Sequence, residues 1–178
     1  DTDNLFHPMF ESQNDGKLYI GAGRYVASLE ELTTFVPATG GTFTWTAQAL
    51  DLPKNFRIKC LTELGNNLEL GTWYSPTGNN YNYDYKVATI FPWDRSSASF
   101  GQPIVIPECG VNQIITIDQY IYFQAGVDGK YFKSNGVGYV KIAQIPTSVV
   151  DLTPNSKLAN LPGAIMAVNG RLFSGISA

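Results

Sequence analysis

A short strand motif recurs at a nearly constant interval along this chain of 178 residues. The motif is an apolar run that begins after a turn and ends on a glycine. Its four copies are Gly16–Gly21, Asn67–Gly71, a looser Tyr120–Gly126, and Gly170–Gly175. Equivalent positions in successive copies are 50, 53 and 51 residues apart, at Leu18, Leu68, Ile121 and Leu172. A period of this size indicates an array of repeated supersecondary units.

A second landmark supports the same period. A proline follows the last strand-like run of each unit, at Pro53, Pro107 and Pro162, with spacings of 54 and 55 residues. The final copy also aligns with residues 8 to 21 without a gap. We therefore divide the chain into units 8–53, 54–107 and 108–162 and a half unit 163–178.

Within the units, short alternating runs are separated by Gly, Asn, Asp and Pro, a pattern that predicts strands and hairpins. A single turn of helix is conceivable at 27–32, where Ser28 and Glu31 have the spacing of a capping box. The predicted strands lie near 9–12, 17–23, 24–29 and 42–52; near 56–64, 67–74, 85–93 and 102–106; near 113–117, 120–126, 130–134 and 138–145; and near 164–168 and 171–176.

A unit of about fifty residues with four short antiparallel strands is typical of a β-propeller blade. A single sheet of this kind has two apolar faces, and stacking the sheets around an axis buries both. Three and a half such units do not close a ring, because propellers usually have four to eight blades. We expect the chain to be part of a longer polypeptide. Closure by a second copy, or an open array capped by a neighbour, are the alternatives.

Composition excludes several classes of protein. The net charge is −3 and no run of Lys or Arg occurs, which argues against nucleic-acid binding. No apolar run is long enough to cross a bilayer, so we expect no membrane insertion. Two cysteines, Cys60 and Cys109, are too few for a disulfide scaffold; a single bridge remains open, although free buried cysteine is the commoner state.

No catalytic constellation can be identified, and we expect no cofactor and no metal. The single histidine, His7, leaves little for histidine-based catalysis or metal binding. A calcium site among the Asn and Asp residues of 79–84 is conceivable, but the acidic spacing of a known calcium loop is missing. No spacing pairs two carboxylates as a glycosidase requires. Scattered acidic residues in turns usually bond their own backbone, as we expect for Asp84, Asp94, Glu108, Asp118, Asp128 and Asp151.

Aromatic residues are the richest local feature. They lie in and around the long connection after residue 74, and their alternation at 81, 83 and 85 would place three tyrosines on one face of an extended segment. Such rings either pack within the fold, form a subunit interface, or stack against sugars. The candidate binding residues are Trp73, Tyr74, Tyr81, Tyr83, Tyr85 and Trp93, together with Asp94 at a strand end.

Residues 89–97, followed by 103–108, resemble repeats of bacteriophage and virus-like structural proteins, and residues 128–136 resemble the same material. The resemblance implies a propeller on a virion or another extracellular assembly, and it carries no catalytic residues. We therefore expect a non-enzymatic structural or binding protein whose partners are other protein subunits or copies of itself. The alternative is a carbohydrate-binding or carbohydrate-active propeller, such as a lectin or a glycosidase, with glycans as ligands.

Overall fold

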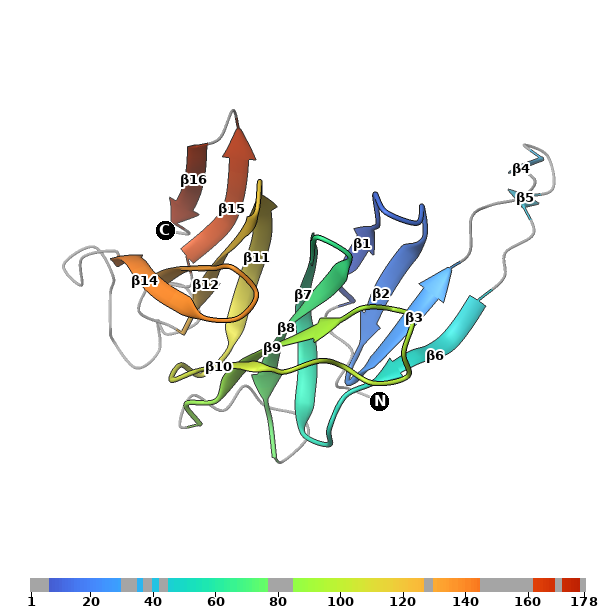
Figure 1. Cartoon of the computed structure of the whole chain (residues 1–178), viewed down its shortest axis with the longest axis horizontal. Helices are drawn as coiled ribbons and strands as arrows, with labels where there is room; N and C mark the ends of the chain where they lie inside the picture. The colour runs from blue at the N-terminus through green and yellow to red at the C-terminus, as the bar shows by residue number, and fades with distance from the viewer. Residues whose placement is uncertain are drawn as a thin grey trace.

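The computed structural model describes residues 7–29, 35–36, 40–41, 45–76, 85–126, 130–144, 162–168 and 171–176. In these ranges the chain forms sixteen strands and no helix. The strands make three four-stranded sheets and two two-stranded sheets, all with antiparallel pairing (Figure 1). The prediction of an all-β chain is confirmed.

The first sheet contains β1 (Met9–Glu11), β2 (Leu18–Ala22), β3 (Tyr25–Leu29) and β6 (Trp45–Asp51), in that order. Two further strands, β4 (Phe35–Val36) and β5 (Gly40–Gly41), pair with each other between β3 and β6, and the sequence did not predict them. The predicted helical turn at 27–32 is wrong over residues 27–29, which end β3. Pairing of β3 with β2 and β6 overrides the weak capping signal there, and residues 30–32 lie outside the described ranges.

The second sheet contains β7 (Phe56–Leu64), β8 (Asn67–Tyr74), β9 (Ala88–Trp93) and β10 (Ile104–Ile106). Its strands again follow one another in chain order. Gly65 has a φ of +58° in the turn between β7 and β8, a conformation that glycine adopts at no steric cost.

The third sheet contains β11 (Val111–Ile117), β12 (Tyr120–Ala125), β13 (Lys130–Ser134) and β14 (Tyr139–Gln144). The two-stranded sheet that follows contains β15 (Pro162–Val168) and β16 (Arg171–Ile176). Fourteen of the sixteen strands correspond to the predicted runs, and several agree at both ends, including β7, β8, β13 and β16.

Two hydrophobic cores separate the three large sheets. The first core lies between the first and second sheets, and the second core lies between the second and third. The sheet β7–β10 is therefore covered on both faces, and every residue of β9 is buried. Members of the first core include Tyr19, Val26, Leu50, Leu70 and Phe91; members of the second include Ile90, Ile106, Val111, Phe123 and Phe132.

Neighbouring sheets approach most closely through the first strands of the units, β1, β7, β11 and β15. β7 lies against β1 and β2, β11 lies against β7 and β8, and β15 lies against β11. The other strands spread apart from this row, so that the sheets fan out (Figure 1).

A glycine in the second strand allows the close approach of the first sheet to the second and of the second sheet to the third. A β-carbon at Gly21 would lie 2.7 Å from Cγ2 of Ile58 in β7, and one at Gly71 would lie 2.8 Å from Cγ1 of Val111 in β11. Contacts this short require the neighbour to move. The repeated glycine therefore marks close packing between sheets, as glycine inside a strand commonly does.

A register irregularity recurs in the first strands. The pairing shifts between Ile58 and Cys60 in β7, between Val111 and Gln113 in β11, and between Pro162 and Ile165 in β15. Bulges of this kind bend a strand and increase its twist. Their recurrence at the same place is a second structural sign of repetition, and the sequence did not reveal it.

Both cysteines are free thiols, so the open question of a bridge is answered. Cys60 lies in β7, where its Sγ lies 3.8 Å from the carbonyl oxygen of Val111. Burial raises the pKa of the Cys60 thiol far above its ordinary value. This thiol is therefore a packing residue and is not poised to react.

Candidate functional site

The turns of the three sheets gather at two opposite ends because the strands alternate in direction. At one end lie the turns 12–17, 65–66, 94–103, 118–119 and 135–138; we call it the Asp94 end. At the other lie the turns 23–24, 53–55 and 107–110 and the connection that leads to Tyr85; we call it the Tyr85 end. The predicted site residues divide between these two ends.

Trp73 is a structural residue at the Tyr85 end. Its side chain is buried, and its ring lies directly against the backbone of Gly110, where a β-carbon could not fit. Trp73 and Gly110 also form a β-bridge that joins the end of β8 to the start of the third unit. The ring is therefore closed to a ligand.

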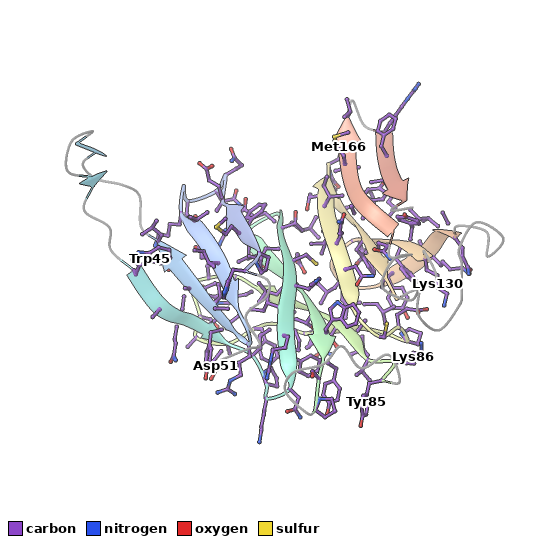
Figure 2. All side chains as sticks on the ribbon, turned by 180° about the vertical axis from the view of Figure 1, so that it is seen from behind. Trp45, Asp51, Tyr85, Lys86, Lys130 and Met166 are labelled. Atoms are coloured by element: carbon purple, nitrogen blue, oxygen red, sulfur yellow. The ribbon has the colours of Figure 1, made fainter. Side chains whose placement is uncertain are left out.

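Tyr74 and Tyr85 form the accessible aromatic group at this end. The Tyr74 ring contacts Phe56 and Tyr85 edge-on, with centroid distances of 5.2 and 5.4 Å. The Tyr85 side chain is exposed, at the lower margin of the view in Figure 2. Tyr81 and Tyr83 lie outside the described residues.

Trp93 and Asp94 lie at the opposite end of the same sheet, since β9 runs from Ala88 to Trp93 away from Tyr85. The buried Trp93 indole donates to the carbonyl of Ser97 at 2.8 Å and meets Tyr19 edge-on at 5.8 Å. Asp94 Oδ1 accepts the backbone N–H groups of Ser96 and Ser97, at 3.0 and 3.1 Å. Asp94 therefore shapes its own turn, as a turn aspartate commonly does.

The remaining acidic candidates have structural partners or lie elsewhere. Glu108 pairs with Lys130 at 2.8 Å, and Asp118 occupies the β11–β12 turn with a φ of +54°. Asp84, Asp128 and Asp151 lie outside the described residues. No two of the three described candidates face each other across an open site.

A hollow of about 490 Å³ opens at the Asp94 end. Its wall combines amide and hydroxyl groups and the Asp94 carboxylate with the half-buried ring of Phe100, which packs edge-on against Phe91 at 4.7 Å. Amides, hydroxyls and an aromatic ring are groups that recognise uncharged polar ligands. The polar side chains in the wall are Asn67, Asp94, Ser97, Ser99 and Gln102.

Arg95, beside this hollow, ties the second sheet to the first. Its guanidinium contacts Glu63, donates to Ser12 Oγ at 2.9 Å and to the carbonyl of Asn66 at 2.8 Å, and lies 3.8 Å from Asp15. The φ of Arg95 is +65°, a conformation uncommon for residues other than glycine. The sequence did not indicate Arg95 as a functional residue; it indicated only the neighbouring Asp94.

The carboxylates around Arg95 are held in the charged form. Burial alone would raise the pKa of Glu63, but hydrogen bonds from Ser12, Arg95 and the backbone of Gln13 outweigh it, and the pKa is lowered. The pKa of Asp15 is lowered for the same reason, since burial is outweighed by hydrogen bonds from Tyr19 and Ser12. This network holds two units together and leaves no free acid for catalysis.

A second hollow, of about 620 Å³, lies on the other side of the β13–β14 turn. Lys133 Nζ lies 3.6 Å from the centroid of the Tyr120 ring, within the range of a cation–π contact. In the described ranges no carboxylate lies within ion-pair distance of Lys133. Tyr139 and the exposed Val140 complete the apolar part of the wall.

Glu69 is a buried carboxyl between the second and third sheets. It lies in β8 with 1% of its surface exposed, and neither of its oxygens has a hydrogen-bond partner among the described residues. Burial raises its pKa to about 7. The position is enclosed, so this group belongs to the packing between sheets.

Two further features are absent from the described ranges. No three His, Cys, Asp or Glu side chains gather there as a metal site would require. No helix in those ranges is long and apolar enough to cross a membrane.

No protein-family model matches the chain, and no curated protein matches it. The resemblance of residues 89–97 to phage structural repeats therefore stays an expectation.

Proposed function

We propose that the chain is a non-enzymatic binding component of a larger protein assembly, built as a segment of a β-propeller. The units 8–53, 54–107, 108–162 and 163–178 are its blades and half blade. Three four-stranded sheets in chain order, with their first strands side by side, support this arrangement. Full closure would require further sheets.

The observation that carries the proposal is the exposure of both outer faces of the array. Met9 and Trp45 lie on the face of the first sheet opposite to the core residue Tyr19, and 67% and 49% of their surfaces are exposed. Met166 and Phe173 pair across β15 and β16 and are exposed by 56% and 49%. Trp45 and Met166 lie at opposite ends of the row of sheets (Figure 2).

Faces of the same kind are buried between the sheets inside the array. An apolar sheet face exposed to water is the usual mark of an interaction surface. We infer that both outer faces are covered by other sheets, supplied by further parts of a longer polypeptide, by other subunits or by copies of this chain. A virion or another extracellular structure is the setting that the sequence resemblance favours.

A carbohydrate-binding role is the second candidate. The hollow beside Phe100 supports it, because its wall offers several hydrogen-bonding side chains beside an aromatic ring.

One experiment separates the two candidates. The purified chain is sedimented over a hundredfold range of concentration, alone and with partner subunits, and is applied to a glycan array. We expect association that Met166→Glu with Phe173→Glu abolishes, and no specific glycan signal. Val105→Glu is the control, because Val105 is exposed by 56% but lies on the edge strand β10 of the middle sheet and not on an outer face. A strictly monomeric chain without protein partners, together with a glycan signal lost in Phe100→Ala, would instead establish the second role.

A further inference from the structure

The hollow of about 490 Å³ at the Asp94 end, which we call the Phe100 hollow, lies where the second and third sheets meet. Its wall comes from Asn67 at the start of β8, from the connection between β9 and β10, and from Gly136 in the β13–β14 turn. The volume falls in the range of about 300–1,000 Å³ that is usual for ligand-binding clefts.

Hydrogen bonds hold the connection between β9 and β10 in one shape. The Trp93 indole donates to the carbonyl of Ser97 at 2.8 Å, and the backbone N–H of Gly101 donates to the carbonyl of Pro92 at 2.7 Å. The Ser97 hydroxyl donates to the carbonyl of Ser99 at 2.7 Å and accepts its backbone N–H at 2.9 Å. The wall is therefore preorganised, and a ligand would not have to order it.

One oxygen of the Asp94 carboxylate is free to bind a ligand. Oδ1 accepts the backbone N–H groups of Ser96 and Ser97, whereas Oδ2 has no hydrogen-bond or ion-pair partner among the described residues. The neighbouring Arg95 does not neutralise this carboxylate, because its guanidinium pairs with Glu63. Asp94 is therefore fixed in place by its turn while its charge stays uncompensated.

Two amide side chains and an aromatic ring complete the wall. In the part of the chain that the structure describes, the side chains of Asn67 and Gln102 make no hydrogen bond, so their carbonyl oxygens can accept one from a ligand. Together with Asp94 Oδ2 they provide three free oxygen acceptors. The rings of Phe100 and Pro92 supply apolar surface, and the face of an aromatic ring attracts cations.

These groups fit an ammonium group on an aliphatic chain better than a neutral ligand. The residues that line the hollow include one carboxylate and no cation. A lysine ammonium has three donors and no acceptor, which matches three free acceptors. A guanidinium fits less well, because it typically binds a carboxylate through both oxygens, and Oδ1 of Asp94 is already used.

We propose that the Phe100 hollow receives a lysine side chain of a partner protein. Asp94 and the amides of Asn67 and Gln102 bind the ammonium group, and the aliphatic stem packs along Phe100 and Pro92. The unpaired charge selects the partner and the rings add contact area. The inference rests on the proposed function and names the chemistry by which the partner is recognised, at a place apart from the outer sheet faces.

The test is an NMR titration of the full, ¹⁵N-labelled chain with N-acetyl-lysine N-methylamide, which presents a lysine as a protein does. We expect saturable shifts confined to the backbone amides of Asn67, Gly136 and residues 94–102. The ε-acetylated compound has no charge and should bind about tenfold more weakly or worse, and the arginine analogue about threefold more weakly. Equal binding of the charged and acetylated compounds would overturn the proposal.

Three chain variants complete the test. Asp94→Asn removes the charge while its side-chain oxygen can still accept from the turn, and it should weaken binding about tenfold. Asp118→Asn is the matched control, because Asp118 is an exposed carboxylate at the same end but outside the hollow, and Asn tolerates its φ of +54°. Its affinity should match that of the parent, and equal losses in these two variants would overturn the proposal. Gln102→Ala changes an exposed side chain and should weaken binding about threefold, which keeps the proposal testable if Asp94→Asn fails to fold.

Two further ligands decide the source of the amine and the rival ligand class. If 1,5-diaminopentane binds far more tightly than the lysine compound, the ligand is a free amine and the assignment to a protein is overturned. If methyl glucoside shifts the same amides and the lysine compound does not, the hollow is a sugar site and the proposal fails.

The outcome for the hollow is separable from that for the proposed function. Asp94→Asn should leave association through the outer sheet faces unchanged. If the chain associates through those faces while the lysine compound does not bind, the inference about the hollow fails and the proposed function stands.

Discussion

A β-carbon at Gly71 would lie 2.8 Å from Cγ1 of Val111, so the second and third sheets meet where one residue has no side chain. The same relationship joins Gly21 to Ile58 between the first and second sheets. The glycine that marks the sequence repeat is thus the contact point between neighbouring units.

Gly71→Ala should destabilise the protein. The added methyl group would collide with Val111 and with the Cys60 thiol, both in packed strands, and overpacking of this kind costs about 1–3 kcal/mol. Urea denaturation measures the loss. Gly138→Ala is the control, because a β-carbon there meets no atom within 4 Å, and its effect should stay within about 0.5 kcal/mol. Equal losses in the two variants would contradict the close-approach argument.

Glu69 should make the protein less stable as the pH rises. Its pKa is about 7 in the folded chain, against 4.5 as the ordinary value. Because the folded pKa is the higher one, folding favours the neutral form, and stability is lost from pH 4.5 upward until the loss is complete above pH 7. The total loss is roughly 3 kcal/mol at about 1.4 kcal/mol per pKa unit.

Glu69→Gln tests this dependence because it removes the titration while keeping the shape. The difference in unfolding free energy between variant and parent should grow between pH 4.5 and 7 and then level off. The side chain in Glu69→Met has a similar size and no polar head. This variant should be more stable than Glu69→Gln at pH 8. A difference that is independent of pH would show that the carboxyl titrates normally.

Arg95→Met should cost about 1–3 kcal/mol at pH 7, because it removes the charge that compensates two partly buried carboxylates. The pKa values of Glu63 and Asp15 are lowered in the folded chain, so their contribution is present above their ordinary values of 4.5 and 3.8. It is lost as the pH falls through the folded values, and the effect of the substitution should shrink on acidification.

The matched control for Arg95 is Arg24→Met. The Arg24 Nε–Asp51 Oδ1 distance is 3.3 Å, but the two side chains are exposed by 32% and 51%. Exposed ion pairs contribute little, so the loss should be clearly smaller than that of Arg95→Met. Chemical denaturation at pH 7 and pH 3 compares the two variants, and an Arg95→Met effect no larger than that of Arg24→Met would refute the bridging role.

Trp73 and Tyr85 should behave differently on truncation, although they are twelve residues apart around one connection. Trp73→Ala removes a ring packed on Gly110 and should cost about 3–5 kcal/mol. Tyr85→Ala removes an exposed ring and should cost less than about 1 kcal/mol. Thermal melting measures both losses. Because its truncation should cost little stability, Tyr85 is the proper position for testing ligand contacts at this end.

The strand pattern could be read from the sequence because turn glycines and asparagines bracket short alternating runs. β4 and β5 could not, since two-residue strands such as Gly40–Gly41 carry no periodicity. Spacing along the chain also grouped the aromatic residues wrongly, because Trp73 and Trp93 flank one connection yet lie at opposite ends of a sheet. Arg95 was missed for a related reason: its partners Ser12 and Asp15 come from the β1–β2 turn and Glu63 comes from β7, and no local signal shows this.

The middle sheet, β7–β10, has no face of its own toward solvent. It cannot be stable before both neighbouring sheets have formed, since a lone sheet with two apolar faces would leave both faces exposed to water. During synthesis, the second unit therefore has to wait for the third to emerge. The amide hydrogens of β8 should exchange with solvent more slowly than those of either outer sheet. Cooperative unfolding of this array should therefore depend most on the middle sheet.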